Sequence, residues 1–78
     1  MPGIYVLINA DMGAENAVLE QIKSVPHVTE ARAVYGAYDI VCLVEAETVT
    51  ELKDIIKERI RKIANVRSTL TMIQINEQ

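Results

Sequence analysis

The chain has 78 residues, enough for one small domain, and half of them (50%) are hydrophobic. A domain of this size buries only about 60–65% of the surface of its unfolded chain, so leftover apolar surface predicts self-association. The net charge of −3 and the isoelectric point of about 5.0 argue against non-specific nucleic-acid binding, which needs a basic surface.

The first half of the chain predicts a strand, an amphipathic helix and a second strand. Residues 4–8 are a continuous apolar run rich in β-branched side chains, as in a buried strand. Residues 14–25 place their apolar side chains on one helical face, and Pro26 ends this helix. Residues 28–35 alternate between a charged face and a small apolar face, with Val28, Glu30, Arg32 and Val34 on one side and Thr29, Ala31, Ala33 and Tyr35 on the other.

The second half repeats this order of elements. Residues 40–44 are again continuously apolar and predict a central strand, joined to residues 28–35 by a short hairpin turn. Thr48 and Glu51 form a predicted capping box at the start of a second helix. The apolar face of that helix holds Val49, Leu52, Ile56, Ile60 and Ile63, with Ile55 beside it. Residues 66–75 predict the last strand, whose alternation places Val66, Leu70 and Met72 on one face.

The order βαββαβ predicts an α+β, ferredoxin-like fold of the dimeric α/β barrel type. Its four strands form one antiparallel sheet, and right-handed crossovers place both helices on one face. The two halves align at residues 25–28 and 63–66, where a helix ends and a valine opens the next strand. The other sheet face has no helix cover, so we expect two such faces to pair, or sheets to join edge to edge.

Few residues of this chain carry chemistry. Cys42 lies inside an apolar run and is interpreted as a structural core thiol. His27 is the one histidine and lies in a predicted loop without a second nitrogen or sulfur ligand, so no metal site is expected. The three glycines are scattered and form no phosphate-binding loop. Catalysis has no positive support, and neither an enzymatic activity nor a cofactor is expected.

A basic cluster closes the second predicted helix. Because its charges complement the helix dipole and two carboxylates balance it, we interpret the cluster as a solvated helix end rather than a nucleic-acid patch. The cations are Lys57, Arg59, Arg61 and Lys62, and the carboxylates are Asp54 and Glu58. The sequence also shows no signal-peptide pattern and no apolar run of transmembrane length, which favours a cytoplasmic location.

The turn Tyr35-Gly36-Ala37-Tyr38-Asp39 is the candidate binding site. Gly36 permits a tight turn that brings backbone N–H groups to the surface, and the two tyrosines each offer an apolar ring with a polar tip. Asp39 can accept a hydrogen bond from an ammonium group or cap backbone donors in its own turn. The set suits a zwitterionic ligand, and a plain hairpin turn explains the same residues equally well.

This turn resembles a known family signature. Gly36-Ala37-Tyr38-Asp39 is similar to the G-x-Y-D motif in the effector-binding domain of the Lrp/AsnC (feast/famine) regulators. Residues 25–28 and 63–69 resemble the family's segments before strands two and four, and the similarity covers essentially residues 1–78. Full regulators carry a helix-turn-helix domain before the first strand, whereas strand one is expected here at Ile4. The resemblance is therefore to the stand-alone RAM form, a single domain over residues 1–78 without a helix-turn-helix.

The resemblance implies a non-enzymatic amino-acid-binding module that oligomerises and modulates Lrp/AsnC regulators. It implies a homodimer built through the sheets and octamers built from dimers, with no direct contact to nucleic acid or membrane. The amino-acid effector would lie between dimers and touch Tyr35, Gly36, Ala37, Tyr38 and Asp39 of one subunit and Ser68 and Thr69 of a neighbour. Ala37 departs from the larger polar residue that many members carry at this position.

Two other classes of protein share the expected fold. Small dimeric ferredoxin-like monooxygenases and isomerases work in a pocket between sheet and helices, often with His or Trp, and this chain offers only His27. ACT-like regulatory domains bind amino acids and carry a glycine in the loop after strand one, where Gly13 stands. The G-x-Y-D segment and the threonine of strand four, Thr69, favour the Lrp/AsnC resemblance over both alternatives.

Overall fold

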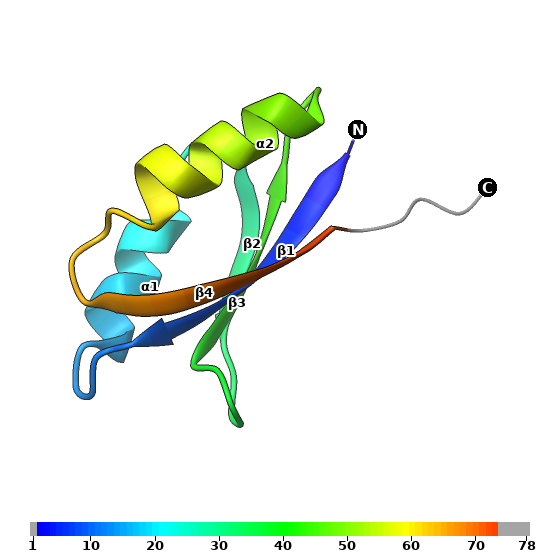
Figure 1. Cartoon of the computed structure of the whole chain (residues 1–78). Coiled ribbons are helices and arrows are strands. Elements are labelled where there is room, and N and C mark those ends of the chain that lie inside the picture. Colours follow the sequence, from blue (N-terminus) through cyan, green and yellow to red (C-terminus); the bar gives the residue numbers. More distant parts are fainter. Residues whose placement is uncertain (1, 74–78) are drawn as a thin grey trace.

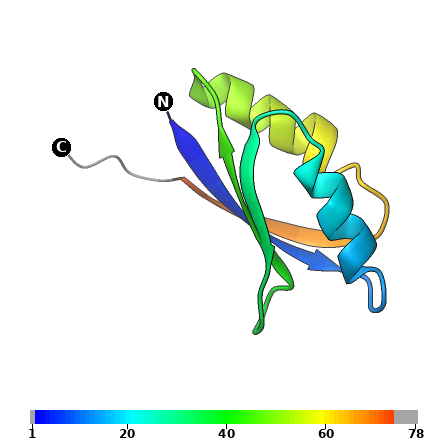
Figure 2. The ribbon, with the colours of Figure 1, turned by 180° about the vertical axis from the view of Figure 1, so that it is seen from behind.

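The computed structural model describes residues 2–73 and confirms the βαββαβ order (Figure 1). The elements are β1 (Gly3–Ala10), α1 (Glu15–Lys23), β2 (Val28–Ala33), β3 (Ile40–Glu45), α2 (Val49–Ile55), a π-helical continuation η1 (Ile56–Ile60) and β4 (Val66–Ile73). The strands form one antiparallel sheet in the order β2-β3-β1-β4. Both helices lie on the same side of this sheet, as the two opposite views show (Figures 1 and 2).

The core lies between the helices and the two central strands. Every second residue of β1 and β3 points into it, which is the two-residue period of a strand with one buried face. The helices contribute residues at three- and four-residue spacing. The buried side chains include Ile4, Val6, Ile8, Val18, Ile22, Ile40, Cys42, Val44, Leu52, Ile56 and Ile60. Cys42 is 1% exposed, as expected of a core thiol, and burial raises the pKa of that thiol to about 11.

The ends of several predicted elements differ by one or two residues from those observed. β1 extends over Gly3–Ala10 because both ends pair with neighbouring strands. α1 is shorter than residues 14–25: after Lys23 the backbone tightens into a three-residue hydrogen bond, from Ser24 N–H to the Gln21 oxygen at 3.2 Å. β4 is described to Ile73, and the last two residues of the predicted strand 66–75 lie outside the described part.

Two β-bulges correct the predicted side-chain alternation. β2 gains one extra residue, Thr29, so Val28 pairs with Val44 and lies on the helix side rather than beside Glu30. β4 gains one at Arg67 in the same way. Val66 therefore packs against the core and does not share a face with Leu70 and Met72, which lie on the opposite side. The two bulges follow the two valines that align in the sequence repeat.

The repeat also shows in the backbone before β2 and β4. His27 and Asn65 occupy the same place in the two halves, and both have a positive φ, 77° and 73°. The His27 carbonyl accepts a hydrogen bond from Glu45 N–H at 3.0 Å, and the Asn65 carbonyl accepts one from Asp11 N–H at 2.8 Å. His27 is thus an exposed residue of a helix-to-strand turn, as the sequence predicts.

The second helix begins at the predicted cap. The Thr48 hydroxyl accepts a hydrogen bond from Glu51 N–H at 3.1 Å, which satisfies one free donor of the first turn. Leu52, Ile56 and Ile60 are buried as expected, whereas Val49 remains 41% exposed. Among the described residues, no helix is long and apolar enough to cross a bilayer.

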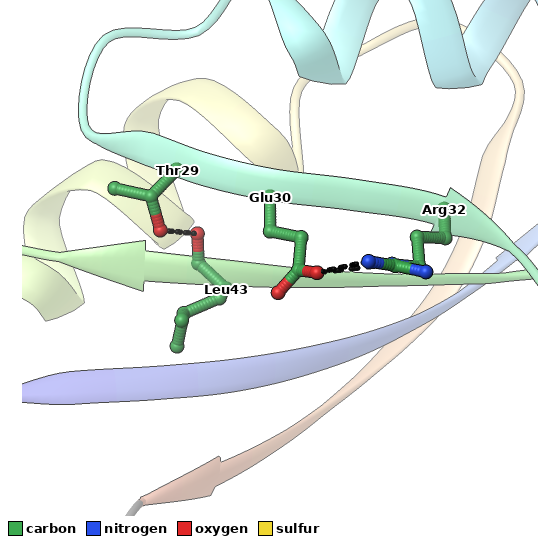
Figure 3. A network of polar contacts seen from close by, with 4 residues as sticks. All are labelled: Thr29, Glu30, Arg32 and Leu43. Carbon is green, nitrogen blue, oxygen red and sulfur yellow. Dashed lines mark hydrogen bonds and ion pairs between the residues drawn. The ribbon is translucent and has the colours of Figure 1, made fainter.

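The sheet face opposite the helices is open and largely apolar. Tyr5, Leu70 and Met72 on this face are 37%, 45% and 47% exposed. Glu30 and Arg32 of β2 lie on the same face, and the Arg32 Nη2 atom is 2.5 Å from the Glu30 carboxylate (Figure 3). We call this surface the open sheet face.

Candidate functional site

The β2–β3 connection is longer than a tight two-residue hairpin. β2 ends at Ala33 instead of residue 35, and Val34 N–H donates to the Asp39 carbonyl at 2.9 Å to close the loop. Gly36 has a φ of 125°, and nothing lies within 4 Å of the position that a Cβ would take. Glycine is therefore required here by backbone conformation and not by lack of space.

Asp39 anchors this loop to the end of β1. Its backbone N–H donates to the Ile8 carbonyl at 3.0 Å. Its carboxylate oxygen Oδ2 accepts a hydrogen bond from Ala10 N–H at 2.9 Å. Asp39 thus caps a backbone donor, one of the two roles that the sequence leaves open, although the donor belongs to β1 and not to the turn itself. Sequence reasoning missed Ala10 because only the strand register brings it beside residue 39.

The other turn residues are turned toward solvent. The hairpin projects at the end of the molecule away from α2 in both views (Figures 1 and 2). Tyr35, Gly36 and Ala37 are exposed, and Tyr38 is half-buried. The hydrogen bonds among the described residues leave the backbone N–H groups of Gly36 and Ala37 without an acceptor. The loop therefore presents backbone donors and the fully exposed ring of Tyr35 on one short segment.

Ser68 and Thr69 lie at the start of β4, on the other side of β1. Thr69 pairs with Ile8, and Ser68 pairs with Asn9, whose side-chain amide donates to the Ser68 hydroxyl at 3.3 Å. Both residues line a groove of about 320 Å³ whose other lining residues are Arg61, Val66 and Arg67. An ion pair between Arg67 Nε and an Asp11 oxygen, 3.8 Å apart, lies beside it. Sequence reasoning did not select Asn9, Asp11 or Arg67, since their proximity depends on the β4 bulge.

The structure brings the two groups of predicted site residues to the same end of one sheet. Ile40, Ile8 and Thr69 form one row across β3, β1 and β4. Asp39 precedes Ile40, so it lies about 10 Å, or two strand spacings, from Thr69. Within the described residues, the turn does not line the groove that holds Ser68 and Thr69. One chain thus holds both groups at one end of its sheet without enclosing them in a single pocket.

Chemistry beyond binding has little support in this arrangement. Among residues 2–73, no group of three His, Cys, Asp or Glu side chains is placed to hold a metal ion. Cys42 is buried, and its raised pKa keeps the thiol protonated near neutral pH, so it is a poor nucleophile. The accessible site consists of backbone donors, hydroxyl groups and charged side chains, which suit the binding of a small polar molecule.

A four-stranded antiparallel sheet in a chain of βαββαβ order, with both helices on one face, defines a ferredoxin-like domain. More specifically, the chain belongs to the Lrp/AsnC ligand binding domain family, whose model matches residues 4–78. An uncharacterized HTH-type transcriptional regulator of Pyrococcus furiosus is 36% identical over 72 residues, which are 88% of this chain and 48% of the relative. The chain therefore spans about half the length of the curated relatives it matches, and it is a regulatory effector-binding module.

Solved structures of the same family share the fold closely. The crystal structure of FFRP-DM1 has a TM-score of 0.91 and 39% identity, covering 96% of this chain and 100% of its own. A feast or famine regulatory protein from M. tuberculosis, complexed with L-methionine, has a TM-score of 0.80 and 26% identity over 99% of this chain and 52% of its own. A part of a homocitrate synthase from Sulfurisphaera tokodaii is also similar, at 39% identity over 61 residues that form 13% of that protein.

Proposed function

We propose that this chain is a non-enzymatic module that binds an amino acid at its Tyr35–Asp39 turn and modulates transcription regulators of the Lrp/AsnC type. The observation that carries the proposal is the turn itself. Gly36 and Ala37 expose backbone N–H groups that suit a carboxylate, and Tyr35 offers a ring to the ligand's side chain. The complex of a related feast or famine regulatory protein with L-methionine supports an amino acid as the ligand class.

Asp39 has a narrower role in this proposal than the sequence gives it. Its Oδ2 atom already accepts the Ala10 N–H bond, so that oxygen holds the turn in place. Oδ1 has no donor among the described residues and can accept from the ligand's ammonium group. Ser68 and Thr69 of a neighbouring subunit complete the site, because the groove that they line in their own chain does not include the turn.

Assembly follows from the open sheet face. We propose that two copies pack these faces together in a homodimer, which buries Tyr5, Leu70 and Met72. In this proposal, dimers then associate into octamers through the end of the sheet that carries the Tyr35–Asp39 turn. A partly exposed apolar sheet face on a chain of this size supports the first step, since it is a poor surface for a monomer. Full-length Lrp/AsnC regulators are the proposed partners, in the cytoplasm.

A small enzyme is the alternative with a specific observation in its favour, since a part of a homocitrate synthase is similar to this chain. That part is only 13% of the synthase, and in the described residues of this chain the one cysteine is buried with a raised thiol pKa and the one histidine lies in an exposed turn. The binding function therefore has the stronger support.

Calorimetry against the twenty amino acids, with the oligomer verified intact, tests the proposal. We expect saturable heat with at least one amino acid at millimolar concentration. Tyr35→Ala should weaken that binding about tenfold, because it removes an exposed ring that packs on the ligand. Val49→Ala, which truncates an exposed side chain at the start of α2 and away from the turn, should leave it unchanged. The absence of heat with all twenty would refute the sensing role.

A further inference from the structure

A second groove lies between the second helix and the helix side of β4. It has a volume of about 260 Å³. Its apolar lining residues, Ile4 and Ile56, are only 2% and 6% exposed. Three cations and one hydroxyl complete the wall, namely Lys53, Lys57, Arg61 and Thr71. The groove combines a small apolar floor with positive charge and a hydrogen-bond donor.

The three cations form a single stripe along the helix. Lys53 lies in α2, Lys57 lies in η1 and Arg61 directly follows η1, and all three line the same groove. Like charges that line one groove repel one another unless something neutralises them. Within residues 2–73 the ion pairs engage other cations, such as Lys62 with Glu58, and no carboxylate lines the groove. Among the described residues the stripe is thus positive charge without an ion-pair partner, on a chain whose net charge is −3.

We propose that this groove binds a small organic dianion with a short aliphatic body, that is, a dicarboxylate. The two carboxylates would meet the Lys53–Lys57–Arg61 stripe and the Thr71 hydroxyl, while the methylene groups would rest on Ile4 and Ile56. Pockets that hold drug-sized ligands measure roughly 300–1,000 Å³, so a groove of about 260 Å³ suits a molecule of only a few carbon atoms.

The apolar floor favours an organic anion over the other anions that such a stripe attracts. Inorganic phosphate has no apolar part to pack against Ile4 and Ile56. Nucleic acid needs a broad basic surface, whereas this chain is acidic overall and only three of its eight Lys and Arg residues line the groove. The groove shares Arg61 with the groove of Ser68 and Thr69, but the Tyr35–Asp39 turn, Ser68 and Thr69 do not line it, and Lys53 and Lys57 line this groove alone.

A calorimetric titration of the intact protein with glutarate at low ionic strength tests this site. We expect saturable binding that weakens about tenfold in Lys57→Gln and in Lys53→Gln, since each removes one charge–charge contact. Arg59→Gln is the matched control: it removes an exposed cation of the same helix outside the groove and should change the affinity less than twofold. Glutamine keeps a good helix propensity, so the variants should fold alike.

Four results would overturn the proposal. They are no glutarate binding at about 20 mM, an equal loss in Arg59→Gln and Lys57→Gln, phosphate binding as tightly as glutarate, and tighter binding of oligoglutamate or duplex DNA than of glutarate. The methyl NMR signals of Ile4 and Ile56 give an independent readout and should shift with glutarate. Amino-acid binding at the turn should stay the same in the Lys53 and Lys57 variants, which separates the two sites.

Discussion

At the level of single residues, Asp39 fixes the hairpin to the rest of the sheet. Its carboxylate and its backbone N–H make two hydrogen bonds to residues at the end of β1, Ala10 and Ile8. These bonds cross from β3 to β1, so they hold the exposed loop in one position relative to the central strands. A binding loop held in this way loses less conformational freedom when a ligand arrives.

Asp39→Ala should lower the free energy of unfolding by about 1–3 kcal/mol, because it leaves the Ala10 N–H without its acceptor. Asp39→Asn should lower the free energy of unfolding by less than half as much, since an amide oxygen can still accept the hydrogen bond from Ala10 N–H. Urea unfolding followed by circular dichroism measures both. The control is Glu47→Ala, which removes an exposed carboxylate. An Asp39→Ala variant as stable as that control would contradict the anchoring role.

Cys42 gives the protein a pH dependence at alkaline pH. Burial raises the pKa of its thiol from 9.0 to about 11, so the unfolded chain releases this proton at a lower pH than the folded one. The stability that the protonated Cys42 thiol contributes is complete below about pH 9 and is lost as the pH rises through about 11.

We expect this proton linkage to reduce stability by roughly 2–3 kcal/mol between pH 9 and pH 11. The stability of Cys42→Ala, which is lower than that of the wild type below pH 9 because of the cavity, should depend less on pH over that interval. Denaturant titrations at matched pH values measure the difference in the free energy of unfolding between the two proteins. The contributions of the lysines and tyrosines that titrate in the same range cancel in this difference. Parallel pH curves for the two proteins would show that Cys42 contributes nothing.

At the level of elements, hydrophobic period and capping account for most of what was predicted. The alternation of buried residues along β1 and β3 and the three- and four-residue spacing in the second helix are local patterns, readable without tertiary contacts. The bulges at Thr29 and Arg67 are not local. An extra residue in a strand is defined only against its partner, so alternation alone placed Val28 and Val66 on the wrong faces.

Thr48→Ala should destabilise the protein by about 1 kcal/mol, because the first turn of α2 loses the acceptor for Glu51 N–H. Thr50→Ala is the matched control on the same helix, where the exposed threonine lies inside the first turn and alanine is the better helix former. Thermal unfolding of both variants measures the effect. Equal melting temperatures for the two variants would rule out a capping contribution.

At the level of the whole molecule, the open sheet face has the greatest consequence. All helices of the described chain cover the same side of the sheet (Figure 2). Tyr5, Leu70 and Met72 on the other side therefore remain partly exposed in one chain. Glu30 and Arg32 add a polar pair to this apolar surface (Figure 3). Polar pairs within apolar surfaces favour one register of association over others.

Leu70→Asp should disrupt the proposed homodimer, because it places a charge in the centre of a surface that association buries. We expect the dissociation constant to rise at least about a hundredfold, measured by analytical ultracentrifugation over a range of concentrations. Val49→Asp is the control: Val49 is 41% exposed, close to 45% for Leu70, but lies on the helix side. Dissociation of both variants would indicate general destabilisation. An intact dimer in both variants would indicate that the dimer uses a different interface.

The sequence by itself determined the order of elements, the fold, the family and the identity of the turn, because each depends on local spacing or on short motifs. The tertiary structure decided which residues meet. It placed the Asp39 carboxylate beside the Ala10 N–H, and it brought Ser68 and Thr69 to the same end of the sheet as the turn. It also set Lys53, Lys57 and Arg61 beside Ile4 and Thr71 in one groove. Those contacts arise from strand register and from a helix packed on the sheet, and neither is encoded in the spacing along one segment.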